Sequence, residues 1–267
     1  MRVFLQAFLW YNPSMTINDF FEEHNKIAIA YSGGTDSVYL LYAAHQAGAD
    51  VRAYYVRSQF QPEFEFSDAK EMAARIFGKN TDRLPLSIIE LDALADNRVS
   101  SNPQDRCYYC KLNIMGTIME AARSDGYTLL CDGTNASDDV NDRPGMKALA
   151  ELGVVSPLRM CGLTKSEIRK RLKDAGIPVW NKPAYACLAT RIASGELITA
   201  DKLRRTETAE GILYDMGFRD FRVRMRGDSA LVQVKADQYR KALDCSVEIV
   251  RNLGNLYKSV AIDSNTR

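Results

Sequence analysis

The chain has 267 residues, of which 46% are hydrophobic and 26% are charged, and its formal net charge at pH 7 is +1. This composition is typical of a globular protein with one large domain and room for a smaller one. The near-neutral charge argues against a protein that coats nucleic acid, and no apolar run approaches the length of a transmembrane helix. Residues 1–10 contain a short apolar stretch without a convincing cleavage site, so we expect a cytoplasmic protein without a signal peptide and with reduced cysteines.

Strand and helix patterns alternate from the start of the chain to about Ala175. Short apolar runs predict strands over residues 27–31, 51–56, 84–91, 127–131 and 154–158. Apolar residues at helical spacing predict helices over residues 16–23, 38–47, 67–77, 111–123, 146–152 and 164–175. Ser67 is an expected N-cap, Thr164 and Glu167 form an expected capping box, and residues 97–106 are expected to form a loop. The alternation indicates an α/β fold with a doubly wound, mostly parallel sheet.

The pattern changes after Pro178. A long connecting segment over residues 180–195 is followed by a helix over 199–216, a hairpin over 218–234 that turns at Gly227, and a final helix over 238–252. We therefore predict two domains, the parallel-sheet domain over residues 1–178 and a smaller α+β domain over residues 179–267.

The stretch I-A-I-A-Y-S-G-G-T-D-S at residues 27–37 joins a buried strand to a helix through a glycine turn. Gly33 and Gly34 allow an anion to approach the backbone N–H groups at the start of the helix. Further donors are the hydroxyl groups of Ser32, Thr35 and Ser37. Asp36 fits a phosphate site only if a metal cation or a reacting group offsets its charge. The spacing matches neither the common P-loop nor the dinucleotide fingerprint. Ser58 follows the next strand, at the edge where such sheets bind ligands.

Cys107 and Cys110 form a C-x-x-C pair between Arg106 and Lys111, where a loop meets a helix. Thiols at this spacing can share a metal ion or form a redox pair, and the basic neighbours favour thiolates. The same spacing also occurs in cysteines that are only packed beside their neighbours. The pair is therefore a candidate metal or redox site.

Cys187 lies in a segment without regular periodicity, between Lys182 and Arg191, and loops of this kind often carry reactive groups. Cysteine is also a common small buried residue, and the spacing by itself favours that interpretation. Cys131, Cys161 and Cys245 lack any such context and are interpreted as packing residues.

Arg222, Arg224 and Arg226 alternate with Val223 and Met225 on a predicted strand, so the three arginines share one face and the apolar residues point to the core. Like charges in a row repel one another, and guanidinium groups bind carboxylates and phosphates well. The row is either an anion site or a solvated face that protects the strand from aggregation.

Taken together, these motifs resemble the LarE family of ATP-dependent sulfur transferases within the PP-loop ATP pyrophosphatase superfamily. The resemblance rests on S-G-G-T-D-S at residue 32, R-C-Y-Y-C-K at 106, D-G-T-N at 132, D-R-P-G at 142, C-L-A-T-R at 187 and F-R-V-R at 221. The first motif marks the superfamily, and the ordered set is more specific. The family implies an adenine nucleotide alpha hydrolase-like fold and a pyridinium dicarboxylate mononucleotide as substrate. It also implies ATP with Mg²⁺, and relatives that assemble into homo-oligomers.

The resemblance also implies roles for individual residues. The expected nucleotide-binding residues are Ser32, Gly33, Gly34, Thr35, Asp36, Ser37, Ser58, Gly133 and Thr134. The expected substrate-binding residues are Arg222, Arg224 and Arg191, and the expected catalytic residues are Cys187, Cys107, Cys110, Asp36 and Glu210. In one branch of the family a cysteine matching Cys187 surrenders its own sulfur. In another, three cysteines hold a 4Fe–4S cluster, and Cys107 and Cys110 place this chain with that branch. The sulfur donor stays open.

Three other classes of protein are alternatives to a sulfur transferase of the LarE family. A tRNA thiolase also pairs a PP-loop with cysteines, but it should carry an RNA-binding domain or a strongly basic face. An ammonia-using synthetase needs no cysteine triad. A zinc-stapled nucleotide-binding module would bind zinc without cleaving ATP.

Overall fold

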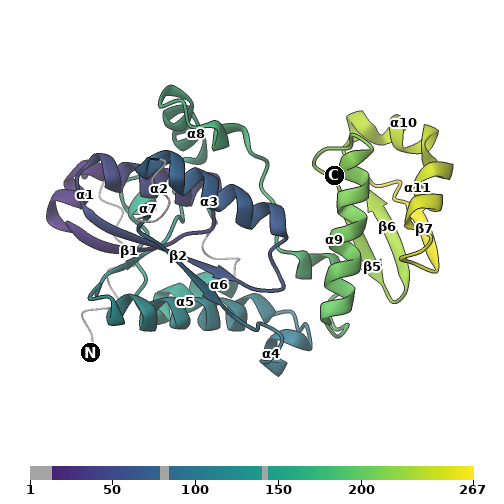
Figure 1. Ribbon diagram of the computed structural model, residues 1–267, viewed down its shortest axis with the longest axis horizontal. Coiled ribbons are helices and arrows are strands. Elements are labelled where there is room, and N and C mark those ends of the chain that lie inside the picture. Colours follow the sequence, from purple (N-terminus) through teal and green to yellow (C-terminus); the bar gives the residue numbers. More distant parts are fainter. Residues whose placement is uncertain (1–13, 79–83, 140–143) are drawn as a thin grey trace. The chain divides into compact units, whose positions relative to one another are not determined.

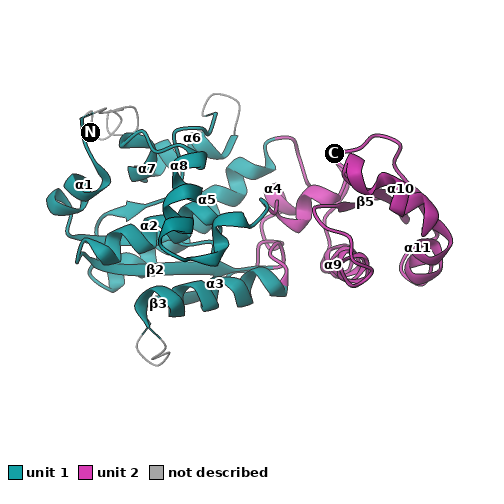
Figure 2. Ribbon diagram, turned by 90° about the horizontal axis from the view of Figure 1, so that it is seen from above, with its two compact units in different colours: residues 1–58, 63–91, 105–184 teal, residues 59–62, 92–104, 185–267 magenta. Residues whose placement is uncertain are grey.

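A computed structural model describes residues 14–78, 84–139 and 144–267. The expectations for Met1–Trp10, and those for Asp142 and Arg143 of the D-R-P-G motif, fall outside these residues. The chain divides into two units (Figure 2): unit 1 comprises residues 1–58, 63–91 and 105–184, and unit 2 comprises residues 59–62, 92–104 and 185–267. None of the described helices is long and apolar enough to cross a membrane.

Unit 1 is built on a four-stranded parallel sheet in the order β3-β2-β1-β4. Its strands are β1 (Lys26–Ala30), β2 (Asp50–Arg57), β3 (Leu86–Glu90) and β4 (Leu130–Cys131). Successive strand residues face opposite sides of a sheet, and in β1 both sides are apolar because Ile27, Ala28 and Ile29 are all fully buried. A strand without a polar face must be covered on both sides, as parallel sheets are.

Helices cover both faces of this sheet (Figure 1). One face packs against α1 (Ile17–Glu23), α2 (Thr35–Gln46), α3 (Glu63–Phe77), α7 (Pro157–Met160) and α8 (Lys165–Asp174). The other packs against α5 (Arg106–Ser124) and α6 (Pro144–Leu152). Alternate residues of β2 divide between the two cores, since Tyr55 belongs to the first and Tyr54 to the second. The predicted doubly wound α/β fold is confirmed.

Three local predictions for the first 160 residues were wrong. Helix α3 begins at Glu63, so Ser67 lies inside the helix and does not cap it. Residues 97–106 are not all loop, because a short helix, α4 (Asn97–Ser100), starts where the Asp96 side chain accepts a hydrogen bond from the Arg98 backbone N–H. The expected fifth strand is reduced to one bridge between Cys131 and Val155, which α7 follows.

Unit 2 contains a three-stranded sheet in the order β5-β6-β7. The predicted hairpin is confirmed as β5 (Arg222–Arg226) and β6 (Ser229–Gln233), and β7 (Ser259–Ile262), which was not predicted, pairs parallel with β6. Helix α9 (Ala200–Asp215) precedes the hairpin. The prediction of a single final helix was wrong, because the segment breaks at Cys245 into α10 (Ala236–Asp244) and α11 (Ser246–Leu253).

Two short segments from the first half of the chain, residues 59–62 and 92–104, also belong to unit 2. The backbone N–H of Leu188 donates to the Phe60 carbonyl over 2.9 Å, and that of Gly195 donates to the Asn102 carbonyl over 2.8 Å. The connecting segment also contains two short 3₁₀ helices, η3 (Pro178–Asn181) in unit 1 and η4 (Leu188–Arg191) in unit 2. The segment around Cys187 is therefore held by backbone hydrogen bonds within unit 2.

Candidate functional site

The glycine turn between β1 and α2 is closed by its own serine hydroxyls. Ser32 Oγ and Ser37 Oγ lie 3.1 Å apart, the Ser32 backbone N–H donates to Ser37 Oγ over 3.2 Å, and Ser37 Oγ donates to the Gly34 carbonyl over 3.1 Å. Gly34 is the N-cap of α2, and no side chain in the described part of the chain caps that end of the helix. The first N–H groups of α2 are therefore arranged as they are in helix-terminal anion sites.

Gly33 allows this turn to lie directly against α3. Its φ is +71°, and a Cβ at this position would lie 2.5 Å from the Cβ of Ala69. The Tyr31 hydroxyl also donates to the Ala69 carbonyl over 2.9 Å. Only a residue without a side chain satisfies both the backbone conformation and the close approach.

Asp36 and Lys165 form an ion pair at the start of α2. Lys165 Nζ, on the first turn of α8, donates to Asp36 Oδ2 over 2.7 Å. The other carboxylate oxygen, Oδ1, is buried, and none of the described residues forms a hydrogen bond with it. Burial raises the pKa of Asp36 and the nearby Asp138 adds to that rise, whereas the Lys165 ammonium and the Asn135 side chain oppose it. A buried orphan oxygen beside an anion-binding turn is suited to a bound cation.

The D-G-T-N turn that follows β4 packs against the glycine turn. A Cβ on Gly133 would lie 2.9 Å from the Ser37 backbone nitrogen, so the two turns are in close contact. The Thr134 hydroxyl donates to Asp132 Oδ2 over 2.6 Å, and the Ser156 hydroxyl donates to Oδ1 over 2.6 Å. The turn is held rigidly next to the predicted nucleotide site. Ser58 directly follows β2, at the carboxyl edge of the same sheet.

Cys107 and Cys110 lie in the first two turns of α5, in unit 1. Cys107 is exposed and Cys110 is half-buried, and side chains three residues apart on a helix are neighbours. The guanidinium of buried Arg106 donates from Nη2 to Cys107 Sγ over 3.7 Å. Within each unit, counting only described residues, no three His, Cys, Asp or Glu side chains form a group that could hold a metal ion.

In unit 2, half-buried Cys187 is the residue that precedes η4, and it is followed by a buried ionic network. The Arg191 side chain is fully buried and donates from Nε and Nη2 to the two carboxylate oxygens of Glu210, over 2.8 and 3.1 Å. Its Nη1 donates to the carbonyls of Ala186 and Cys187, over 2.9 and 3.5 Å. The Tyr185 hydroxyl donates to Glu210 over 2.6 Å. Arg191 therefore hydrogen-bonds the carbonyl group that precedes the Cys187 nitrogen and the one that follows it.

The arginines of β5 differ in their surroundings. Val223 and Met225 are fully buried, as predicted, whereas Arg224 and Arg226 are exposed. Arg222 is only 6% exposed, and its guanidinium lies 5.2 Å from the centre of the Tyr185 ring. Burial, and next the positive charge of Arg191, lower the pKa of Arg222 to about 10. A buried cation of this kind favours the arrival of an anion.

Arg224 lies on the same strand and reaches the Cys187 segment. Its Nη1 donates to the Thr190 carbonyl over 3.2 Å, and its Nε donates to Gln233. Arg191 was also predicted to bind substrate. In this structure its side chain is fully buried and bound to Glu210, so the direct contact with substrate stays a prediction.

Two residues of these sites were not singled out from the sequence. Lys165 is the first residue of α8, and although the capping box placed that helix, it did not indicate what the lysine side chain would reach. Tyr185 lies within the K-P-A-Y-A-C run, where no spacing marks it as functional. Both residues act through partners distant in the sequence.

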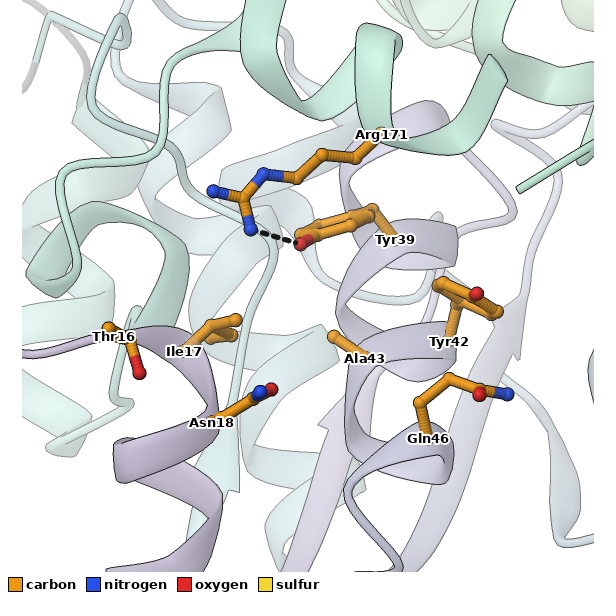
Figure 3. Close-up of a pocket in the computed structure, with 8 residues that line it drawn as sticks. All are labelled: Thr16, Ile17, Asn18, Tyr39, Tyr42, Ala43, Gln46 and Arg171. Carbon is orange, nitrogen blue, oxygen red and sulfur yellow. Dashed lines mark hydrogen bonds between the residues drawn. The ribbon is translucent and has the colours of Figure 1, made fainter. Parts of the chain in front are cut away.

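A pocket of about 450 Å³ lies elsewhere in unit 1, between α1, α2 and α8 (Figure 3). Its lining residues are Thr16, Ile17, Asn18, Tyr39, Tyr42, Ala43, Gln46 and Arg171. Arg171 Nη1 donates to the Tyr39 hydroxyl over 3.1 Å. None of the residues predicted to bind nucleotide lines this pocket.

Three relatives are similar to most of this chain. No protein-family model matches it. The chain is 32% identical over 254 residues to an uncharacterized protein of Synechocystis, slr1717, with 92% of each chain covered. It is 29% identical over 241 residues to the pyridinium-3,5-bisthiocarboxylic acid mononucleotide synthase of Lactiplantibacillus plantarum, covering 89% of this chain and 85% of that one. It is 26% identical over 242 residues to an uncharacterized protein of Methanocaldococcus jannaschii, MJ0830, with 90% of each covered.

Proposed function

The chain belongs to the same family as slr1717 of Synechocystis. We propose that it is an ATP-dependent sulfur transferase, on the sequence motifs and on the similarity to the synthase of Lactiplantibacillus plantarum. Its substrate is a pyridinium dicarboxylate mononucleotide, and its product carries a thiocarboxylate in place of a carboxylate. The name of the Lactiplantibacillus relative supports this substrate class. The product belongs to the synthesis of a nickel-pincer nucleotide, as the sequence motifs imply.

The observation that carries the proposal is the charge arrangement at the glycine turn. Asp36 presents one buried oxygen that no described residue hydrogen-bonds, and Lys165 neutralises the other. A carboxylate beside a turn that binds phosphate through N–H groups would repel the phosphate unless a cation lies between the two anions. Mg²⁺ prefers carboxylate and phosphate oxygens, so Asp36 would hold it and the ion would offset the phosphate charge.

The proposed reaction has two steps. A carboxylate oxygen of the substrate attacks the α-phosphorus of ATP, which forms an acyl-adenylate and releases pyrophosphate. A sulfide equivalent attacks the activated carbonyl carbon, and AMP leaves with the carboxylate oxygen. The N–H groups at the start of α2 and the Lys165 ammonium stabilise the departing pyrophosphate.

Unit 2 supplies the residues for the mononucleotide. Arg222 and Arg224 provide guanidinium groups for its phosphate, and the buried position of Arg222 strengthens that attraction. Glu210 accepts hydrogen bonds from Arg191, Tyr185 and the Val223 backbone N–H. With its oxygens occupied in this way, Glu210 serves as a positioning residue for the Cys187 segment.

Sulfur delivery involves the cysteines. Cys107 and Cys110 share one helix face and fit two thiolate ligands of an iron–sulfur cluster. The resemblance to the family implies Cys187 as the third ligand. Such a cluster, when bound, leaves one iron open to hold a sulfide. The alternative source is the sulfur of Cys187 itself, which leaves dehydroalanine behind.

The enzymatic test uses the full chain with Mg·ATP, the pyridinium dicarboxylate mononucleotide and sulfide. We expect AMP and pyrophosphate in equal amounts, and a thiocarboxylate product detected by mass spectrometry. Asp36→Asn should abolish AMP formation, whereas Asp215→Asn, an exposed change on α9, should not. Formation of ADP, or of AMP only when bulk tRNA replaces the mononucleotide, would contradict the proposal.

The sulfur source is tested separately by anaerobic purification. A cluster predicts brown protein that contains iron and acid-labile sulfide, and Cys107→Ala should bleach it. Colourless wild-type protein whose intact mass falls by one sulfur after turnover, with the loss mapped to Cys187, would show sacrificial transfer instead.

A further inference from the structure

Residues 178–182, hereafter the strap, lie against the nucleotide-binding turn within unit 1. The strap comprises η3 and Lys182. Thr35, the first residue of α2, is 5% exposed, and its hydroxyl donates to the Val179 carbonyl over 3.3 Å. Val179 is itself buried. The side chain of a residue predicted to bind phosphate is therefore occupied by the strap.

Lys182 fastens the end of the strap to two other helices. Its Nζ lies 3.0 Å from Glu65 Oε2 and 2.9 Å from Asp68 Oδ2, both on α3. Its carbonyl accepts a hydrogen bond from Arg169 Nη2 on α8 over 3.0 Å. The side chains of Lys182 and Glu65 are only 17% and 13% exposed, so solvent screens this pair weakly.

The same two helices also contact the nucleotide-binding turn. Helix α3 carries Ala69, against which Gly33 packs, and α8 carries Lys165, which pairs with Asp36. The chain then runs on from Lys182 to Cys187, five residues later. A single set of contacts therefore joins the predicted phosphate site to the segment that leads to the sulfur-bearing cysteine.

We propose that Thr35 and Lys182 are positioning residues that couple nucleotide binding to the state of Cys187 through the strap. This inference rests on the proposed function. A hydroxyl group has one proton to donate, so Thr35 cannot donate to Val179 and to a phosphate oxygen at once. Nucleotide that recruits the Thr35 hydroxyl releases Val179, while Lys182 keeps the strap attached to α3 and transmits the shift toward Cys187.

The strap carries its own reporter. Trp180 lies in η3, and Trp10 is the only other tryptophan in the sequence, so Trp10→Phe leaves a single tryptophan within the strap. The probe nucleotide is α,β-methylene-ATP with Mg²⁺, which cannot be cleaved between the α- and β-phosphates. Two signals are followed in the full chain: Trp180 emission, and the rate at which iodoacetamide alkylates Cys187, read by peptide mass spectrometry.

In the Trp10→Phe parent, saturating nucleotide should shift Trp180 emission and change the Cys187 alkylation rate by at least about fivefold. Lys182→Met should still bind the nucleotide, by calorimetry, but should change the alkylation rate by less than about twofold. Lys182→Arg should restore the response, and Lys170→Met, an exposed change on α8, should behave like the parent. If Lys182→Met does not fold, Asp68→Asn at the half-exposed partner serves for the same comparison.

Two results would overturn the inference. One is a parent that binds nucleotide without any change at Trp180 or Cys187. The other is a Lys182→Met protein that keeps both responses. A parent that binds no nucleotide at all would instead remove the proposed function, and this inference with it.

Discussion

Replacing Glu210 with glutamine should cost unit 2 about 3–5 kcal/mol of folding free energy. The carboxylate accepts four hydrogen bonds, two from Arg191 over 2.8 and 3.1 Å, one from Tyr185 over 2.6 Å and one from the Val223 N–H over 2.9 Å. The side chains of Arg191 and Glu210 are 0% and 8% exposed, so water cannot replace the lost partner. Glutamine leaves the guanidinium buried without a counter-charge and turns an N–H₂ group toward existing donors.

Equilibrium urea unfolding of the full chain measures this loss, with hydrogen exchange of the α9 and β5 amides reporting on unit 2 itself. Asp215→Asn, exposed at the end of α9, should change the free energy by less than about 0.5 kcal/mol. Arg191→Leu combined with Glu210→Gln should cost less than the sum of the two single changes, because the charges are removed together. A loss below about 1 kcal/mol for Glu210→Gln would refute the claim that this pair holds the Cys187 segment.

Three further predictions follow from other contacts. Gly33→Ala should destabilise unit 1 by about 2–5 kcal/mol in thermal unfolding, because it adds a clash with Ala69 to an unfavourable φ. Gly48→Ala has a similar φ but open space around it, and should cost only about 1–2 kcal/mol; equal losses would refute the packing argument. Burial raises the pKa of Cys161 to about 11, so in protein freed of any cluster, near pH 8, iodoacetamide should alkylate it at least about tenfold more slowly than exposed Cys107, and equal rates by peptide mass spectrometry would contradict this. Arg224→Ala should weaken calorimetric binding of the dicarboxylate mononucleotide by about tenfold or more while ATP binding is kept, and parallel losses would refute its assignment to the substrate.

The sequence was sufficient for the parallel-sheet fold because its signals are local. The apolar run at Ile27–Ile29 requires burial on both sides, and the glycines that follow mark a turn whose φ at Gly33 suits only glycine. Thr164 and Glu167 form the expected capping box within four residues of chain. The hairpin of unit 2 could also be predicted from the sequence, since its two strands are adjacent in the chain.

Signals that depend on distant partners were missed. β7 has a short, half-exposed pattern and becomes a strand only because β6 offers it an edge. The excursions at residues 59–62 and 92–104 look like ordinary loops of the first half of the chain, yet they hydrogen-bond to segments near Leu188 and Gly195. Pairing of this kind depends on tertiary packing rather than on local propensity.

The sequence by itself was sufficient to propose a type of chemistry, because a glycine turn after a buried strand, paired cysteines and a row of arginines are each recognisable within a few residues. The tertiary structure alone decided which charges meet. Lys165 reaches Asp36 across 129 residues of chain, and Glu210 gathers Arg191, Tyr185 and Val223 into one buried network. A buried charge is stable only beside its partner, and which partner that is depends on how distant segments pack.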